Sequence, residues 1–252
     1  TRKENNLTVH ITDELPSDVT GVFKAVVDER ARTASACNHS ATHLLQRALR
    51  KVLGDHVEQK GSLVSPASLR FDFSHFQKVT DEELHEVERI VNADIRADYS
   101  LDENRSCPID RAKELGAMML FGEKYGDVVR VIKFGDSVEL CGGTHVAATG
   151  RIGFFKIISE GAISAGVRRI EAVTGESAVE FVQKIATAIK KMQGVLNSPD
   201  VFPAVERLIA HNSELSKKAE EFHKLRNQTQ AAEIEKRLEV RASGEWYVNT
   251  LN

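Results

Sequence analysis

The spacing of apolar residues divides the chain into three regions. Near the N-terminus, apolar and polar positions alternate in two short runs, Leu7–Ile11 and Val22–Val27, which are separated by Pro16 and Gly21. Strands have this period of two. We therefore predict that residues 1–32 form a β segment, the remnant of an upstream β-barrel whose remaining strands precede this chain.

Helical and strand-like patterns occur in clusters between residues 33 and 175. A helix is predicted from about Ala34 to Leu53, because apolar residues recur on one face and Gly54 is a typical helix terminator. A second helix is predicted to begin after Thr80, since Thr80 and Glu83 have the spacing of a capping box. Apolar runs predict strands at Ser62–Val64, Leu69–Phe73, Val128–Phe134, Ile152–Ser159 and Val167–Val173. Clustered elements of both kinds indicate an α+β domain.

Residues 176–242 have the composition of a helical linker. They are rich in Ala, Glu, Lys and Gln, and their apolar residues recur at helical spacing. Ser198 and Pro199 divide the pattern in two, which predicts a helical hairpin or coiled coil. Both a solvated spacer and a partner-binding surface fit this pattern. In residues 243–252, the strand-like run Trp246–Val248 predicts the start of a truncated C-terminal domain.

Composition narrows the class of protein. The chain is 41% hydrophobic and 28% charged, which is typical of globular proteins, and no apolar run is long enough to predict a membrane span. A formal net charge of −3 argues against a DNA-binding protein, so any RNA contact must come from local patches. The three cysteines are far apart, which favours a reducing, cytoplasmic location over a disulfide scaffold. The first residue is Thr1 and no signal sequence follows, so we expect a fragment of a longer protein.

Two pairs of potential metal ligands stand out. His39 and His43 are four residues apart on the predicted helix and therefore share one face. Cys141 and His145 flank Gly142-Gly143-Thr144, and the glycines allow the backbone to fold tightly. Three imidazoles and one thiolate form a set that Zn²⁺ binds tetrahedrally. We predict one zinc per chain, although each pair alone also fits a surface pair or a simple turn.

Other interpretations of these residues find less support. A zincin-type protease would need a Glu directly after the first His as general base, and Ser40 occupies that position. Cys37 lies about 200° around the helix from His39 and should face elsewhere. Together with His75 it is a spare ligand candidate, and Cys107 is expected to be structural. The sequence shows no nucleophilic triad and no phosphate-binding loop, so we expect no ATP binding by this chain.

Several motifs resemble, in the same order, those of the alanyl-tRNA synthetase editing domain. The strongest are Glu139–His145 (ELCGGTH) and Gly166–Gly175 (GVRRIEAVTG). Further matches are Asn38–Leu45, Gln59–Val64, Leu69–His75 and Phe121–Tyr125. The resemblance is dense over residues 20–175. It departs at Ser159–Ser164, where relatives more often carry Ser-Gly after the Glu. Threonyl-tRNA synthetase editing domains and free-standing AlaX trans-editing deacylases share the ligand pairs, but the second motif and the helical tail favour the alanyl enzyme.

This resemblance implies a zinc-containing editing domain of the threonyl/alanyl-tRNA synthetase second additional domain type, followed by a helical segment. The implied activity is hydrolysis of the ester in Ser-tRNA(Ala) and Gly-tRNA(Ala), so mischarged tRNA(Ala) is the expected partner. The implied zinc ligands are His39, His43, Cys141 and His145. Gln59, Cys141 and His39 are implied in catalysis, and Arg168, Arg169 and Lys60 in tRNA binding.

Some alternatives stay open on the sequence alone. The class II synthetase motifs are not found, so ligation and ATP use are expected only of the parent protein. A structural zinc domain that docks tRNA or protein without catalysis, and a free-standing deacylase, both fit the motifs. One of the adjacent arginines would pair with Glu171 if its role were only structural. Neither the oligomeric state nor the choice between water activation and substrate positioning by zinc follows from the sequence.

Overall fold

A computed structural model describes residues 2–5, 7–15, 17–119 and 125–239. The chain divides into two compact units, residues 1–180 and 181–252. Of the motif Phe121–Tyr125 only Tyr125 is described, and the predicted domain start at residues 243–252 lies outside the described residues.

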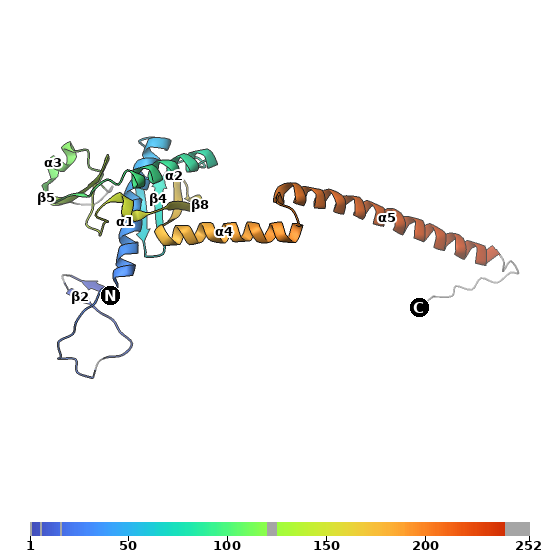
Figure 1. The fold of residues 1–252 in the computed structure, drawn as a ribbon, viewed down its shortest axis with the longest axis horizontal. Coiled ribbons are helices and arrows are strands. Elements are labelled where there is room, and N and C mark those ends of the chain that lie inside the picture. Colours follow the sequence, from blue (N-terminus) through green and yellow to red (C-terminus); the bar gives the residue numbers. More distant parts are fainter. Residues whose placement is uncertain (1, 6, 16, 120–124, 240–252) are drawn as a thin grey trace. The chain divides into compact units, whose positions relative to one another are not determined.

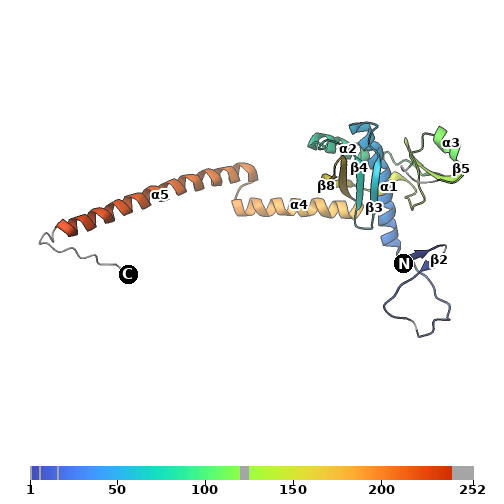
Figure 2. The ribbon, with the colours of Figure 1, turned by 180° about the vertical axis from the view of Figure 1, so that it is seen from behind.

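The central element of the first unit is helix α1 (Glu29–Leu53), which runs between two β-sheets in both views (Figures 1 and 2). It ends where predicted, because Gly54 adopts a φ of 111° that favours glycine. It begins earlier than predicted, because the Asp28 side chain accepts a hydrogen bond from Ala31 N at 3.0 Å and caps the first turn.

A four-stranded antiparallel sheet packs with α1 and forms the main core. Its strand order is β3 (Gln59–Val64), β4 (Leu69–Ser74), β9 (Val167–Thr174) and β8 (Phe155–Ser164). Helix α2 (Asp81–Arg96) contributes to the same core, and the predicted capping box of Thr80 and Glu83 is confirmed. Fully buried side chains include Leu44, Leu45, Phe71, Phe73, Phe155 and Ile170. The predicted α+β class is confirmed.

A second, three-stranded sheet has the order β5 (Asp102–Pro108), β6 (Val128–Phe134) and β7 (Ser137–Leu140), with the short helix α3 (Ile109–Glu114) beside it. Strand β6 connects two cores, because successive side chains alternate between its faces. Val129 and Val131 pack with Cys107 in a small cluster, whereas Ile132 and Phe134 join the main core. Cys107 is fully buried there, as expected of a structural residue.

Two strand predictions need correction. Residues 22–27 form no strand, and the exposed fraction of Val22 is 103%. An alternating run without a partner strand gains too little from local propensity to become a strand. Among the described residues of this region, the strands are β1 (Arg2–Glu4) and its partner β2 (Leu7–Val9). The strand predicted from Ile152 begins at Phe155 instead, since Thr149–Ile152 form the 3₁₀ turn η1 and Gly153 has a φ of 75°.

Two helices follow, α4 (Gly175–Leu196) and α5 (Val201–Glu239). They are interrupted at the predicted place, where Asn197 adopts a φ of 47°. Apolar side chains along both helices are half exposed, including Val182, Ile185, Ile189, Leu215 and Phe222. The helical segment predicted after the α+β domain is therefore confirmed as two successive helices. No helix among the described residues has the length and apolar character needed to cross a membrane.

Candidate metal centre

Four side chains from two elements converge beside α1. His39 and His43 project from α1, and Cys141 and His145 come from the loop after β7. Their donor atoms all lie within 4.8 Å of one another. Cys141 Sγ is 3.4 Å from His39 Nε2 and 3.3 Å from His145 Nε2. The two pairs recognised in the sequence therefore form one cluster that can hold a metal ion.

Gly143 makes this approach of loop and helix possible. A Cβ built at position 143 would overlap the imidazole ring of His39, whereas one at Gly142 would meet no atom within 4 Å. The two glycines therefore have different roles. Gly143 leaves room for a metal ligand, and Gly143 N also donates a hydrogen bond to Cys141 Sγ at 3.4 Å.

Arg130 of β6 holds the ligand loop from the other side. One guanidinium nitrogen donates to Cys141 O at 2.8 Å and to Gly143 O at 2.6 Å. Its Nε donates to Glu103 at 2.7 Å, which orients the guanidinium group. Arg105 pairs with the same carboxylate. The loop conformation is thus fixed by charge-assisted hydrogen bonds to its own carbonyl groups.

Burial keeps the imidazoles of the cluster neutral. Desolvation, aided by the neighbouring imidazoles and Arg130, lowers the pKa of His43 well below its ordinary value. Desolvation and the His39 ring likewise lower the pKa of His145 to about 3. Desolvation raises the pKa of the Cys141 thiol. Neutral imidazoles offer lone pairs, and a metal ion supplies the charge that a buried thiolate requires.

Two buried atoms at the cluster have no hydrogen-bond partner among the described residues: Nδ1 of the ligand His43 and Oε1 of the neighbouring Glu139. The other carboxylate oxygen of Glu139 is 3.4 Å from His43 Nε2. Burial raises the pKa of Glu139 to about 8. Carboxylates that hydrogen-bond a histidine ligand are common beside metal ions, where they orient the ring. An orphaned nitrogen, a nearby carboxyl group and an N₃S donor set therefore fit a bound metal.

The remaining predicted residues lie outside this cluster. Gln59 is half-buried at the start of β3, opposite Phe73. Lys60 pairs with Glu58 at 2.9 Å. Arg168 binds Glu160 through Nε and through Nη2, the latter at 2.8 Å, and Arg169 binds Asp72 at 2.7 and 2.8 Å. Neither arginine uses Glu171, which instead accepts a hydrogen bond from Ser159.

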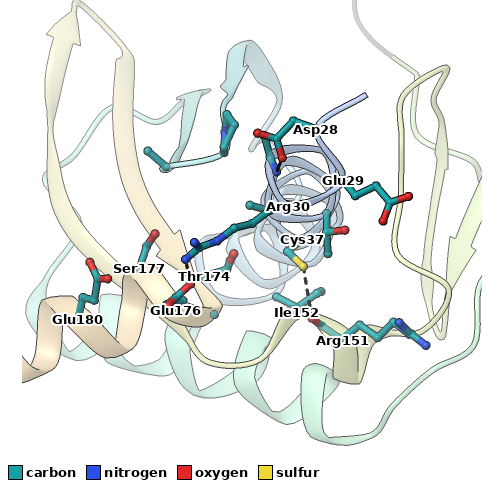
Figure 3. Close-up of a pocket in the computed structure, with 16 residues that line it drawn as sticks. Asp28, Glu29, Arg30, Cys37, Arg151, Ile152, Thr174, Glu176, Ser177 and Glu180 are labelled. Atoms are coloured by element: carbon teal, nitrogen blue, oxygen red, sulfur yellow. Dashed lines mark hydrogen bonds and ion pairs between the residues drawn. The ribbon is translucent and has the colours of Figure 1, made fainter. Parts of the chain in front are cut away.

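The two spare ligand candidates also lie elsewhere. His75 pairs with His56, with Nδ1 and Nε2 2.8 Å apart. Cys37 faces a separate cavity of about 760 Å³ near the starts of α1 and α4, and its thiol donates to Arg151 O at 3.3 Å (Figure 3). Arg30 and Glu176 form an ion pair in this cavity wall. None of the four clustered residues lines that cavity.

Sequence reasoning missed Glu139 and Arg130 as members of the site. Both stand out in the sequence by their neighbours. Arg130 is the one charged residue in the otherwise apolar run Val128–Ile132. Glu139 lies two residues before Cys141, in the same motif as two of the ligands. Charged residues at strand positions flanked by buried ones are expected to have partners.

Comparisons with known proteins agree with this description. A family model described as "Threonyl and Alanyl tRNA synthetase second additional domain" matches residues 129–171. Alanine–tRNA ligase of Bacteroides fragilis is 59% identical over 225 residues, covering 89% of this chain and 26% of the relative. The ligase of Parabacteroides distasonis is 56% identical over 223 residues, 88% of this chain and 26% of the relative. The ligase of Cytophaga hutchinsonii is 53% identical over 225 residues, which cover 88% of this chain and 26% of the relative.

The chain spans about a quarter of the length of these curated relatives. The family model begins within β6 and ends within β9, so it includes Cys141 and His145. The resemblance inferred from the motifs is thereby confirmed: the chain carries the second additional domain of threonyl and alanyl tRNA synthetases and matches, over most of its length, a segment of alanine–tRNA ligases.

Proposed function

We propose that this chain is the editing part of an alanyl-tRNA synthetase and hydrolyses the ester of Ser-tRNA(Ala) and Gly-tRNA(Ala) at a zinc-dependent site. The observation that carries the proposal is the convergence of His39, His43, Cys141 and His145 within 4.8 Å. ATP-dependent ligation of alanine is assigned to the part of the ligases outside the matched segment. The expected setting is the cytoplasm, with tRNA and neither DNA nor membrane as partner.

The chemistry of alanine selection explains why such a site is useful. A pocket sized for alanine cannot strongly exclude the smaller glycine, and an apolar pocket rejects an added hydroxyl only weakly. A second, hydrolytic site corrects both errors after the ester has formed. A deacylase domain in the same protein as the ligase can therefore remove both glycine and serine from mischarged tRNA(Ala).

The residues of the cluster are suited to zinc. His39, His43 and His145 would donate neutral nitrogens, and the Cys141 thiolate would accept the Gly143 N–H. When bound, zinc supplies Lewis acidity that polarises an ester carbonyl or acidifies a water molecule. Desolvation favours the unprotonated imidazoles of His43 and His145, and Arg130 holds the loop in place. Gln59 is proposed to contact the seryl hydroxyl or the attacking water.

A structural metal centre without catalysis is the second candidate. The full set of four protein ligands favours it, because catalytic zinc sites usually keep one position open for water or substrate. In that case the domain would dock tRNA or protein. Removal of zinc would unfold the domain, and no deacylation would depend on the metal.

Removal of the metal separates these candidates. If the site is catalytic, dialysis of the folded protein against a chelator should abolish deacylation of Ser-tRNA(Ala), and added Zn²⁺ should restore it. Circular dichroism before and after chelation shows whether the fold persists. Unchanged deacylation by the metal-free, folded protein would contradict the zinc-dependent mechanism.

Arg168, Arg169 and Lys60 are proposed to contact the acceptor end of the tRNA. Each already has a carboxylate partner, and the exposed fraction of the side chain falls from 37% for Lys60 to 31% for Arg169 and 12% for Arg168. A phosphate contact by Arg168 therefore has to compete with Glu160. Removal of the Glu160 charge is therefore a control for removal of the Arg168 charge.

Neutralising Arg168 should flatten the salt dependence of tRNA binding, because each phosphate contact contributes about one unit to the logarithmic slope. Arg168→Gln removes the cation, whereas Glu160→Gln breaks the same ion pair and leaves the cation in place. The slope should fall only for Arg168→Gln, as measured by tRNA affinity across a salt series. Wild-type slopes for both variants would mean that Arg168 makes no phosphate contact and only pairs β9 with β8 through Glu160.

A further inference from the structure

Ser40 is a buried polar residue that the proposed mechanism leaves without a role. It lies between the two histidines of α1 and its exposed fraction is 0%. It occupies the position directly after His39, where a zincin helix carries its glutamate. Its Oγ is 3.1 Å from His145 Nδ1 and accepts the backbone N–H of Val146 at 3.1 Å. A single hydroxyl of α1 thus contacts the loop that carries the other ligand pair.

The position of one proton decides which nitrogen of His145 can bind a metal. His145 Nε2 is 3.3 Å from Cys141 Sγ, so Nε2 faces the other donor atoms. A neutral imidazole carries its proton on one nitrogen and a lone pair on the other. Metal binding through Nε2 therefore requires the proton on Nδ1. The hydroxyl oxygen of Ser40 is 3.1 Å from His145 Nδ1 and can accept a hydrogen bond from a proton there.

We propose that Ser40 is a positioning residue of the metal centre, whose Oγ accepts both His145 Nδ1–H and Val146 N–H and so fixes the tautomer and the orientation of the His145 ring. These two hydrogen bonds use both lone pairs of the hydroxyl oxygen. Hydrogen-bond partners of histidine ligands have this effect in metal sites generally. The inference rests on the metal centre of the proposed function and adds a residue to it.

Thr42 supplies a matched control two residues along the same helix. Its side chain is also buried, and its hydroxyl donates to Asn38 O within α1 at 2.9 Å. Ser40→Ala and Thr42→Ala each remove one buried hydroxyl from α1. Only the first removes a partner of a ligand, so loss of general packing and loss of ligand orientation can be told apart.

The test is Zn²⁺ affinity of the full chain, measured by competition with a chromophoric chelator. Ser40→Ala should weaken binding by about 10–100-fold, the range seen when partners of metal ligands are removed, whereas Thr42→Ala should bind as wild type does. The Co²⁺-substituted protein gives a second readout, since its visible absorption reports coordination geometry. Ser40→Ala should change this spectrum and Thr42→Ala should not.

Two results would overturn the assignment of Ser40. One is wild-type Zn²⁺ affinity and an unchanged Co²⁺ spectrum in Ser40→Ala. The other is an equal loss of affinity in both variants, which would indicate general packing. A wild-type chain that binds no Zn²⁺ at all is a different result, because it would overturn the proposed metal centre and this inference with it.

Discussion

Alanine in place of Gly143 should empty the metal centre. The added Cβ would overlap the His39 ring, so either the ring or the loop with Cys141 and His145 must move. All four donors have to converge on one ion, and a displaced ligand breaks this arrangement. Metal affinity should fall by at least the roughly 10–100-fold that follows from disturbing the partners of metal ligands. Deacylation should fall with it.

The neighbouring glycine is the control for this prediction. A Cβ at Gly142 meets open space, and neither glycine has the positive φ that would make alanine strained in itself. Gly142→Ala should therefore retain zinc. The measurement is metal content and Zn²⁺ affinity of the two variants purified side by side. Full occupancy in Gly143→Ala, or an equal loss in Gly142→Ala, would contradict the geometry described for the loop.

Removal of Cys141 should have a comparably large effect. The thiolate is the only sulfur donor in the cluster and the only ligand whose negative charge would offset that of the ion. Cys141→Ala leaves three neutral imidazoles, which bind zinc more weakly than the full N₃S set. Zinc content, determined by mass spectrometry after identical purification, should drop from one per chain to a small fraction of that value.

Cys37 provides the comparison, since it lies on α1 close to His39 but faces the separate cavity. Cys37→Ala removes a thiol that donates to Arg151 O, so some stability should be lost while zinc content stays at one per chain. A Cys141→Ala protein with full zinc content would show that the metal centre has been assigned to the wrong residues.

The parts of this site that could be predicted are those encoded by local spacing. His39 and His43 follow the helical repeat, and Gly54 ends the helix through its own backbone preference. Likewise, Cys141 and His145 are close in sequence, so a short loop alone brings them together. That the two pairs meet was suggested by their complementary chemistry, and the structure places them together.

What could not be predicted depends on contacts distant in sequence. Strand β5 is rich in polar residues and has only Cys107 fully buried, so its sequence shows no apolar alternation, and pairing with β6 determines its conformation. The run Val22–Val27 has the alternation but no partner, and it stays irregular. Arg130 and Ser40 gain their roles only because the ligand loop folds against them.

We expect the chain to hydrolyse Ser-tRNA(Ala) and to spare Ala-tRNA(Ala). The two esters have similar intrinsic reactivity, so discrimination must arise in the side-chain pocket. A polar group such as Gln59 can hydrogen-bond the seryl hydroxyl, whereas the methyl group of alanine would leave it unpaired. An unpaired polar group costs about 1–3 kcal/mol, which corresponds to roughly 5–150-fold in rate. Glycine lacks the hydroxyl, so discrimination in its favour should be weaker.

The most direct measurement is single-turnover release of labelled serine and of labelled alanine from charged tRNA(Ala), with wild type, Gln59→Ala and Cys141→Ala. Wild type should release serine faster by the factor given above. Gln59→Ala should lose most of this preference, and Cys141→Ala should release neither amino acid above the uncatalysed rate. Equal release of serine and alanine by wild type, or wild-type rates after removal of Cys141, would contradict the editing function proposed for this metal centre.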